Sequence, residues 1–316
     1  MKSSITIVLT IVVAVNAFAQ DTPGVSETLL TQRTPPRFGT VRYLDGEPAA
    51  GVHVTFYPGT YSSDDDYNYR EAITDKNGRY EILWPKKWSI SGWGWEQRFP
   101  TNTIMARDFE RNFAAVQAFD RTITNVDLTL QPAITLSGSV KNTEGVPVSG
   151  AEIGLGFVSA RYAPEMRPPF KADEHGQFSI PALPQGIEYW ISGITAKGYG
   201  SSNAIVKAKD TQTNRYEFPT FVLKHADRIL AGQVLDSDGM PVARAVVEFR
   251  GDGQPQNSKT KTDSEGRFFS DTVCDGVVRV SADFFGPPFK SDGGGAGAPV
   301  QAGDTNVIIR IRDQNK

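Results

Sequence analysis

Three stretches of this 316-residue chain begin alike, about one domain length apart. Gly, Val, Gly and Pro recur at identical offsets in Gly39–Pro48, Gly138–Pro147 and Gly232–Pro241. The starts are separated by 99 and then 94 residues, which is too long for a solenoid repeat and suits a whole domain. The repeat therefore predicts three related domains in tandem.

Each start leads into a stretch in which every second side chain is apolar, the pattern of a strand with one face towards a core. These residues are Val52, Val54 and Phe56, then Ala151, Ile153 and Leu155, and finally Ala245, Val247 and Phe249. An acidic residue followed by Gly, first at Asp45-Gly46, marks the turn before each stretch, because Gly tolerates the positive φ that such turns need.

A second shared element follows in each copy, at Thr74–Tyr80, Ala172–Phe178 and Thr262–Phe268. Asp and Gly frame a turn, and an aromatic residue then begins the next strand. One Asp per turn supplies too few oxygen ligands for calcium. We therefore expect each Asp to accept hydrogen bonds from backbone N–H groups of its own turn.

The sequence is typical of an all-β protein, since 30 Gly and 20 Pro suit many turns between short strands. We predict three tandem Greek-key β-sandwich domains of about seven strands each, at residues 37–131, 132–224 and 225–313. Almost no linker is left around Pro132 and Lys224. Successive domains should therefore sit like stiff beads.

The opening G-x-V…D/E-G-x-P…A-x-V pattern and the T-D-x-x-G-x-F/Y element resemble the carboxypeptidase regulatory-like domain, whose fold is transthyretin-like (prealbumin-like) and belongs to the wider carbohydrate-binding-like class. The resemblance covers all three domains, with departures such as Arg244 where the other copies have Gly51 and Gly150. It implies β-sandwich modules that are mostly accessory or structural.

The N-terminus predicts export. Residues 1–19 combine one Lys, an apolar run and the Ala17-Phe18-Ala19 pattern read by signal peptidase, and residues 20–36 read as an exposed leader. The mature protein would be periplasmic or extracellular. Its single cysteine, Cys274, can form no intramolecular disulfide, and we expect it to be a small buried residue.

No pattern in the sequence favours an enzyme. The histidines His53, His175 and His225 stand in no metal-binding or catalytic motif, so we predict no catalytic residue, metal or cofactor. A net charge of −3 and the absence of a Lys/Arg cluster also argue against nucleic acid as a partner.

The candidate ligand-binding residues lie in the first domain. Four tryptophans fall within twelve residues, and of these Trp88, Trp93 and Trp95 could offer flat indole surfaces to a sugar ring. Large aromatic residues are usually packed, so we favour a role in the core or a joint, with at least one indole exposed or interfacial. The nearby acidic loop adds Tyr61, Tyr67 and Tyr69 and is read as solvated rather than calcium-binding.

These features leave three hypotheses about function, of which the first two are the main ones. The first is a secreted, non-catalytic module protein that binds extracellular or cell-wall polysaccharide through its first domain. The alternative is a structural or adhesive spacer whose partners are proteins of the cell envelope. The third is an accessory subunit that presents a separately encoded enzyme.

Overall fold

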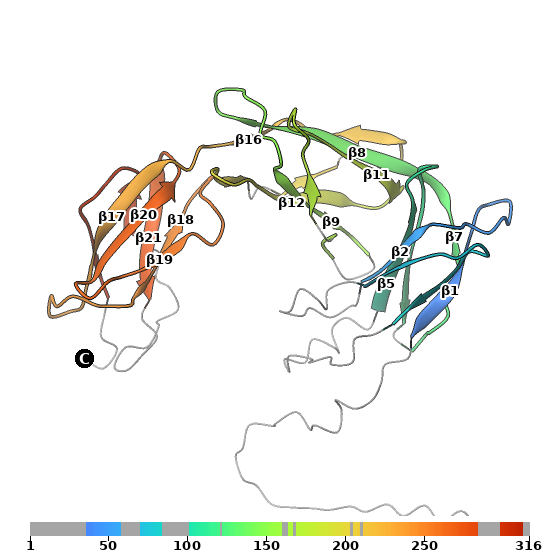
Figure 1. The fold of residues 1–316 in the computed structure, drawn as a ribbon, viewed down its shortest axis with the longest axis horizontal. Helices are drawn as coiled ribbons and strands as arrows, with labels where there is room; N and C mark the ends of the chain where they lie inside the picture. Colours follow the sequence, from blue (N-terminus) through green and yellow to red (C-terminus); the bar gives the residue numbers. More distant parts are fainter. Residues whose placement is uncertain are drawn as a thin grey trace, which may run out of the picture.

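The computed structural model describes residues 36–57, 70–83, 101–120, 122–159, 164–166, 169–202, 205–208, 211–283 and 298–311. In this part of the chain every regular element is a β-strand, which confirms the all-β prediction. No helix in it is long and apolar enough to span a membrane. Figure 1 shows the strands gathered into three units that follow one another along an arch.

A separate hydrophobic cluster lies at the centre of each unit. The first unit is built around Val41, Val54 and Phe56, together with residues as far as Leu130. The second cluster includes Ile153, Leu155 and Phe221, and the third includes Val247, Phe249 and Ile309. The alternating residues singled out by the repeat therefore face inward, as predicted.

The first and third units have the same strand order. The first contains β1 (Arg37–Arg42), β2 (His53–Tyr57), β3 (Arg70–Ile73), β4 (Arg79–Ile82), β5 (Thr101–Asp108), β6 (Phe113–Asp120) and β7 (Leu128–Thr129). The third contains β17 (Arg228–Leu235), β18 (Val246–Arg250), β19 (Lys259–Lys261), β20 (Arg267–Val273), β21 (Val277–Asp283), β22 (Ala298–Gln301) and β23 (Val307–Arg310). One sheet runs β4-β1-β7 or β20-β17-β23, and the other runs β3-β2-β5-β6 or β19-β18-β21-β22.

The second unit follows the same plan with short strands replacing single longer ones. It contains β8 (Gln131–Asn142), β9 (Glu152–Phe157), β10 (Phe170–Lys171), β11 (Gln177–Pro184), β12 (Tyr189–Thr195), β13 (Ser201–Ser202), β14 (Val206–Lys207), β15 (Arg215–Glu217) and β16 (Phe221–Leu223). Strands β15 and β16 both pair in parallel with β8, as β7 does with β1. Strands β13 and β14 both pair with β12.

The Asp-containing turns have the geometry expected from the sequence. The Oδ1 atom of Asp75 accepts hydrogen bonds from the backbone N–H groups of Asn77 and Arg79, at 2.8 and 2.9 Å. Asp173 and Asp263 do the same in the other two units. Gly78 closes the first of these turns at φ +72°, where a Cβ would lie 2.3 Å from the Val41 carbonyl oxygen. The turn therefore requires Gly both for its conformation and for space.

A single sheet connects the first two units. Strand β6 pairs with β8 at Phe113↔Pro132 and Ala114↔Gln131, so one sheet runs β11-β8-β6-β5-β2-β3. In Figure 1 the long strand β8 leads from the first unit over the top of the second. Backbone hydrogen bonds thus cross the boundary between the units, which is a closer connection than a short linker alone would give.

Candidate functional site

The candidate ligand-binding residues Tyr61, Tyr67, Tyr69, Trp88, Trp93 and Trp95 lie outside the residues that the structure describes. The segments that carry them join β2 to β3 and β4 to β5. Phe56 of β2 pairs with Arg70 of β3, and Tyr57 pairs with Thr103 of β5. The first segment and the β5 end of the second are therefore attached at the same end of one sheet, whereas the second segment begins at β4 in the other sheet.

The two joints between units contain several of the buried polar residues of the described chain, among them Arg107, Ser201 and Gln254. At the first joint, strand β5 is buried on both faces. Ile104 and Ala106 face the first core, whereas Met105 joins the second core together with Tyr57. The outer face of the first unit's sheet thus forms a wall of the second unit's core.

Arg107 is the central polar residue of this joint. Its side chain lies on the outer face of β5, and the residue is 7% exposed. Nε donates a 3.0 Å hydrogen bond to the carbonyl oxygen of Ala182, and Nη2 donates a 2.7 Å bond to that of Pro181. The guanidinium carbon lies 4.6 Å from the ring centre of Phe109 and 5.7 Å from that of Phe170. Burial lowers the pKa of Arg107, which reflects the cost of withdrawing its charge from water.

The backbone segment that Arg107 holds is strained. Ala182 has φ +56° at a bulge in β11, where the pairing register shifts between Ile180 and Leu183. Its N–H donates a 2.7 Å hydrogen bond to Oδ1 of Asn112 in the first unit, and its carbonyl accepts from Arg107. A non-glycine residue keeps such a conformation only where its surroundings fix it, and here both polar groups of Ala182 are held by the first unit.

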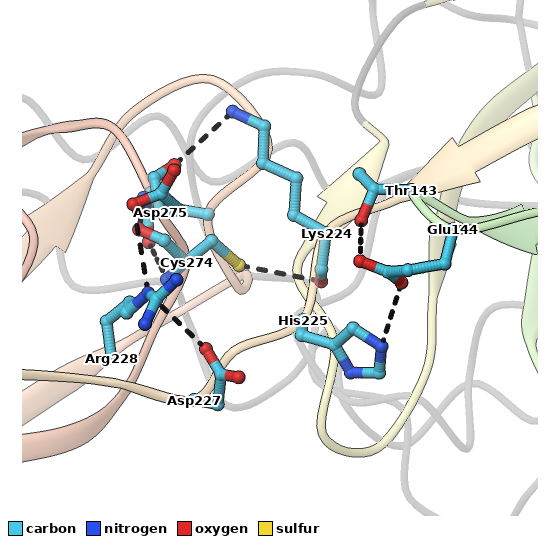
Figure 2. A network of polar contacts seen from close by, with 9 residues as sticks. Thr143, Glu144, Lys224, His225, Asp227, Arg228, Cys274 and Asp275 are labelled. Atoms are coloured by element: carbon cyan, nitrogen blue, oxygen red, sulfur yellow. Dashed lines mark hydrogen bonds and ion pairs between the residues drawn. The ribbon is translucent and has the colours of Figure 1, made fainter.

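The second joint is formed by the short segment between β16 and β17. Gly200 donates its N–H to the carbonyl of Lys224 at 2.8 Å, and Ala226 donates to the carbonyl of Gly198 at 2.9 Å. Figure 2 shows the Lys224 side chain reaching into the third unit, where its Nζ lies 3.5 Å from the carbonyl oxygens of Asp252 and Asp275. Lys224 thereby links the segment to two loops of the third unit.

Cys274 lies behind this segment and is completely buried, as the sequence predicted. Its Sγ is 3.7 Å from the carbonyl oxygen of Lys224, and burial raises the pKa of the thiol. The side chain of Gln254 bridges the same loop, donating to the carbonyl of Cys274 and accepting from its N–H. Ser201 of the second unit in turn donates from its hydroxyl to the carbonyl of Gln254 at 2.6 Å.

His225 attaches the segment to the second unit. Its Nε2 lies 3.0 Å from Nδ2 of Asn142 and 3.3 Å from Oε2 of Glu144, and its ring centre is 4.6 Å from that of Tyr199. Figure 2 shows the imidazole turned towards Glu144, whose other oxygen accepts from Thr143. No sequence motif around His225 indicates this role, because Asn142 lies 83 residues away in the chain.

Both joints consist of hydrogen bonds, packing and fixed charges. Among the described residues, no group of three or more His, Cys, Asp and Glu side chains is arranged to hold a metal ion. These contacts position each unit against the next.

Comparison with known proteins identifies no family for this chain. No family model matches the sequence, and no curated protein matches it. Among solved structures, a streptococcal ancillary pilin is similar at 10% identity and a TM-score of 0.36, covering 89% of this chain and all of that one. The Bacillus anthracis TIE protein is similar at 12% and 0.28, covering 89% of this chain and 50% of that one. The shaft pilin SpaA from Lactobacillus rhamnosus GG is similar at 12% and 0.25, covering 58% and 96%. These TM-scores are too low to carry any inference about fold or function.

Proposed function

We propose that this chain is an exported, non-catalytic structural spacer of the cell envelope, in which three β-sandwich domains follow one another without flexible linkers and the first two hold a fixed position relative to each other. The proposal takes the domains as residues 37–131, 132–224 and 225–313. The observation that carries it is the first joint, where a shared sheet and the buried Arg107 unite two domains. Such a joint suits a protein that must keep two ends apart at a set distance, because the units cannot reorient without breaking backbone pairing and exposing a core.

We also propose that the three units are carboxypeptidase regulatory-like modules. The shared strand order of the first and third units supports descent from one module, as does the sequence pattern that recurs in all three units. In this view the modules act as a scaffold, and the partners of this chain are proteins of the cell envelope.

The spacer function is tested by the distance distribution across the first joint. Spin labels would be placed at the exposed positions Arg79→Cys and Lys171→Cys, one in each unit. The distance between them would be measured by pulsed electron–electron double resonance. Because Cys274 is buried, the labels go to the introduced cysteines. We expect one narrow distance peak.

The matched control carries a flexible Gly/Ser insertion between Leu130 and Gln131 and should give a broad distribution. A broad distribution in the uninserted protein would refute a fixed spacer. Solution scattering of residues 20–316 gives a second readout, because an arch of three units has a larger radius of gyration than a single compact globule of this length.

Polysaccharide binding through the first domain is the second candidate. It is favoured by one observation, the attachment of the first aromatic-rich segment and of the β5 end of the second at the same end of a sheet. A glycan array probed with the mature protein and with a Trp93→Ala/Trp95→Ala double variant tests it. Binding that is lost in a still-folded double variant would support the sugar site, and no binding by either protein would leave the spacer function alone.

A further inference from the structure

The orientation of the Asn142 side chain is fixed by its own turn. Asn142 ends β8 and is 5% exposed. Its Oδ1 accepts hydrogen bonds from the backbone N–H groups of Glu144 and Val146, at 3.0 and 2.8 Å. The amide nitrogen must therefore point the other way, towards Nε2 of His225 at 3.0 Å.

This orientation determines the protonation state of His225. An amide nitrogen only donates, so Nε2 must accept, and the imidazole is then neutral with its proton on Nδ1. The second neighbour of the same nitrogen is the carboxylate of Glu144, 3.3 Å away. A carboxylate only accepts, and Nε2 can donate to it only after gaining a proton. The two neighbours therefore require opposite protonation states of one nitrogen.

Glu144 is suited to pair with a protonated His225. The hydrogen bond from Thr143, at 2.8 Å, is the main cause that holds the pKa of the Glu144 carboxyl below its ordinary value. The carboxylate is thus charged in the range where an imidazole ordinarily titrates. Because 60% of the Glu144 side chain is exposed, it can move to follow the ring, whereas the buried Asn142 cannot.

The other charged groups near His225 do not offer a competing partner. On the linking segment, the Lys224 ammonium is directed to carbonyl oxygens of the third unit, and Asp227 lies 3.7 Å from Arg228. Arg228 is also 3.7 Å from Asp275 on the third unit. From the second unit, the Tyr199 ring covers one face of the imidazole and would attract a cationic ring.

We propose that the joint between the second and third units is a proton-operated hinge, in which protonation transfers His225 from Asn142 to Glu144 and shifts the segment that carries the third unit. His225 is bridged to Tyr199 through the backbone, and the next residues lead directly into β17. Because only Ala226 and Asp227 separate His225 from β17, a shift of His225 would move the start of the third unit.

At the first joint, His53 pairs with Arg107 in the strand register, and its ring centre lies 5.1 Å from that of Phe109. A backbone pair and an edge contact between rings require no particular protonation state, so this joint should not respond.

The test compares two pairs of spin labels in the full-length mature protein at about pH 8 and about pH 5, which bracket the titration of an ordinary imidazole. One pair, Lys171→Cys with Lys259→Cys, spans the hinge, and the Arg79→Cys with Lys171→Cys pair spans the first joint. We expect the hinge pair to shift from one distance to another as the pH falls, while the first-joint pair stays constant. A hinge distance that does not change while His225 titrates would overturn the proposal.

Three variants assign the response. His225→Gln can still accept from Asn142 but gains no proton, so it should keep the high-pH distance throughout. Glu144→Gln removes the anionic partner and should reduce the low-pH population. The matched control His175→Gln removes the exposed turn histidine of the second unit and should respond like the wild type.

Nitrogen NMR of the His225 ring checks the premise directly. We expect the proton on Nδ1 at high pH, and a proton on Nε2 instead would overturn the proposal. A failure of the spacer function would show separately, as a broad distribution for the first-joint pair at both pH values.

Discussion

The hydroxyl of Thr103, in β5 of the first unit, donates a 2.7 Å hydrogen bond to the hydroxyl of Ser159, just beyond β9 of the second. Both residues are buried, at 2% and 6% exposure. The two hydroxyls come from different units, yet both are shielded from water. The bond therefore contributes to a joint that behaves as protein interior.

A double-mutant cycle should measure this coupling. Thr103→Val and Ser159→Ala each leave the partner hydroxyl buried without its bond, so each should lower the free energy of unfolding by about 1–3 kcal/mol. The double variant should lose less than the sum by about 1 kcal/mol. Urea denaturation of the four proteins gives the values, and strict additivity would show that the two hydroxyls do not interact in solution.

Arg107→Ala should uncouple the first two units. The substitution removes both donors to the carbonyls of Pro181 and Ala182, and we expect a loss of about 2–4 kcal/mol in the stability of the joint. In calorimetry the shared transition of the two units should split into two. Arg79→Ala, which truncates an exposed arginine of the same unit, is the matched control and should change stability by less than about 0.5 kcal/mol. Equal effects of the two substitutions would contradict the role assigned to Arg107.

Phe56→Ala and Phe249→Ala should have similar costs, because the two residues occupy equivalent core positions and are 0% and 2% exposed. Emptying a buried phenylalanine site lowers stability by about 3–5 kcal/mol. The first substitution should unfold the first unit and the second the third, as hydrogen exchange followed by mass spectrometry can show for each separately. A loss below about 1 kcal/mol at either position would mean that its side chain is not in the core.

These core positions could be predicted from the sequence because the information is local and is written three times. Alternation every second residue gave the inward faces of β2, β9 and β18, and the Asp-x-x-Gly pattern gave turns in which Asp75 and its counterparts accept backbone N–H bonds. Both depend on residues close together in the chain. Because both patterns recur at the same positions in all three copies, chance does not account for them.

The joints could not be predicted because they use residues that do not repeat. By strand register, His53 pairs with Arg107 in the first unit and Val246 pairs with Asp283 in the third, so the third unit has an acidic residue at the position of Arg107. One signal of the first joint is nevertheless present in the sequence. Tyr57 and Met105 place large apolar side chains on the outer face of the first sheet, and apolar residues on both faces of a strand indicate burial on both sides.

Stability at high pH should depend on Tyr43. Burial, together with the 2.6 Å hydrogen bond that its hydroxyl donates to Asp108, raises the pKa of Tyr43 to about 12 from an ordinary value of about 10. The raised value means that the folded state favours the neutral phenol. This contribution is complete below about pH 10 and is lost as the pH rises to about 12. Tyr43→Phe keeps the edge contact with Phe113 but should flatten this part of the pH dependence in urea denaturation. An unchanged alkaline slope would show that Tyr43 is not the group responsible.

Gly200→Ala should disrupt the second joint. A Cβ at this position would lie 1.8 Å from the carbonyl oxygen of Gly253 and 2.6 Å from Sγ of Cys274, so backbone of the third unit would have to move. The hydrogen bond from the Gly200 N–H to Lys224 would be displaced as well.

We expect the Gly200→Ala protein to retain three folded units but to show a broad distance distribution between labels at Lys171→Cys and Lys259→Cys, and faster proteolysis near Lys224. Gly193→Ala is the matched control in the same unit. Its added Cβ would lie 3.2 Å from the end of the flexible Gln256 side chain, which can move aside, so the distribution should stay narrow. A narrow distribution in Gly200→Ala would mean that the third unit is positioned by the polar contacts of Lys224 and His225 rather than by this close backbone approach.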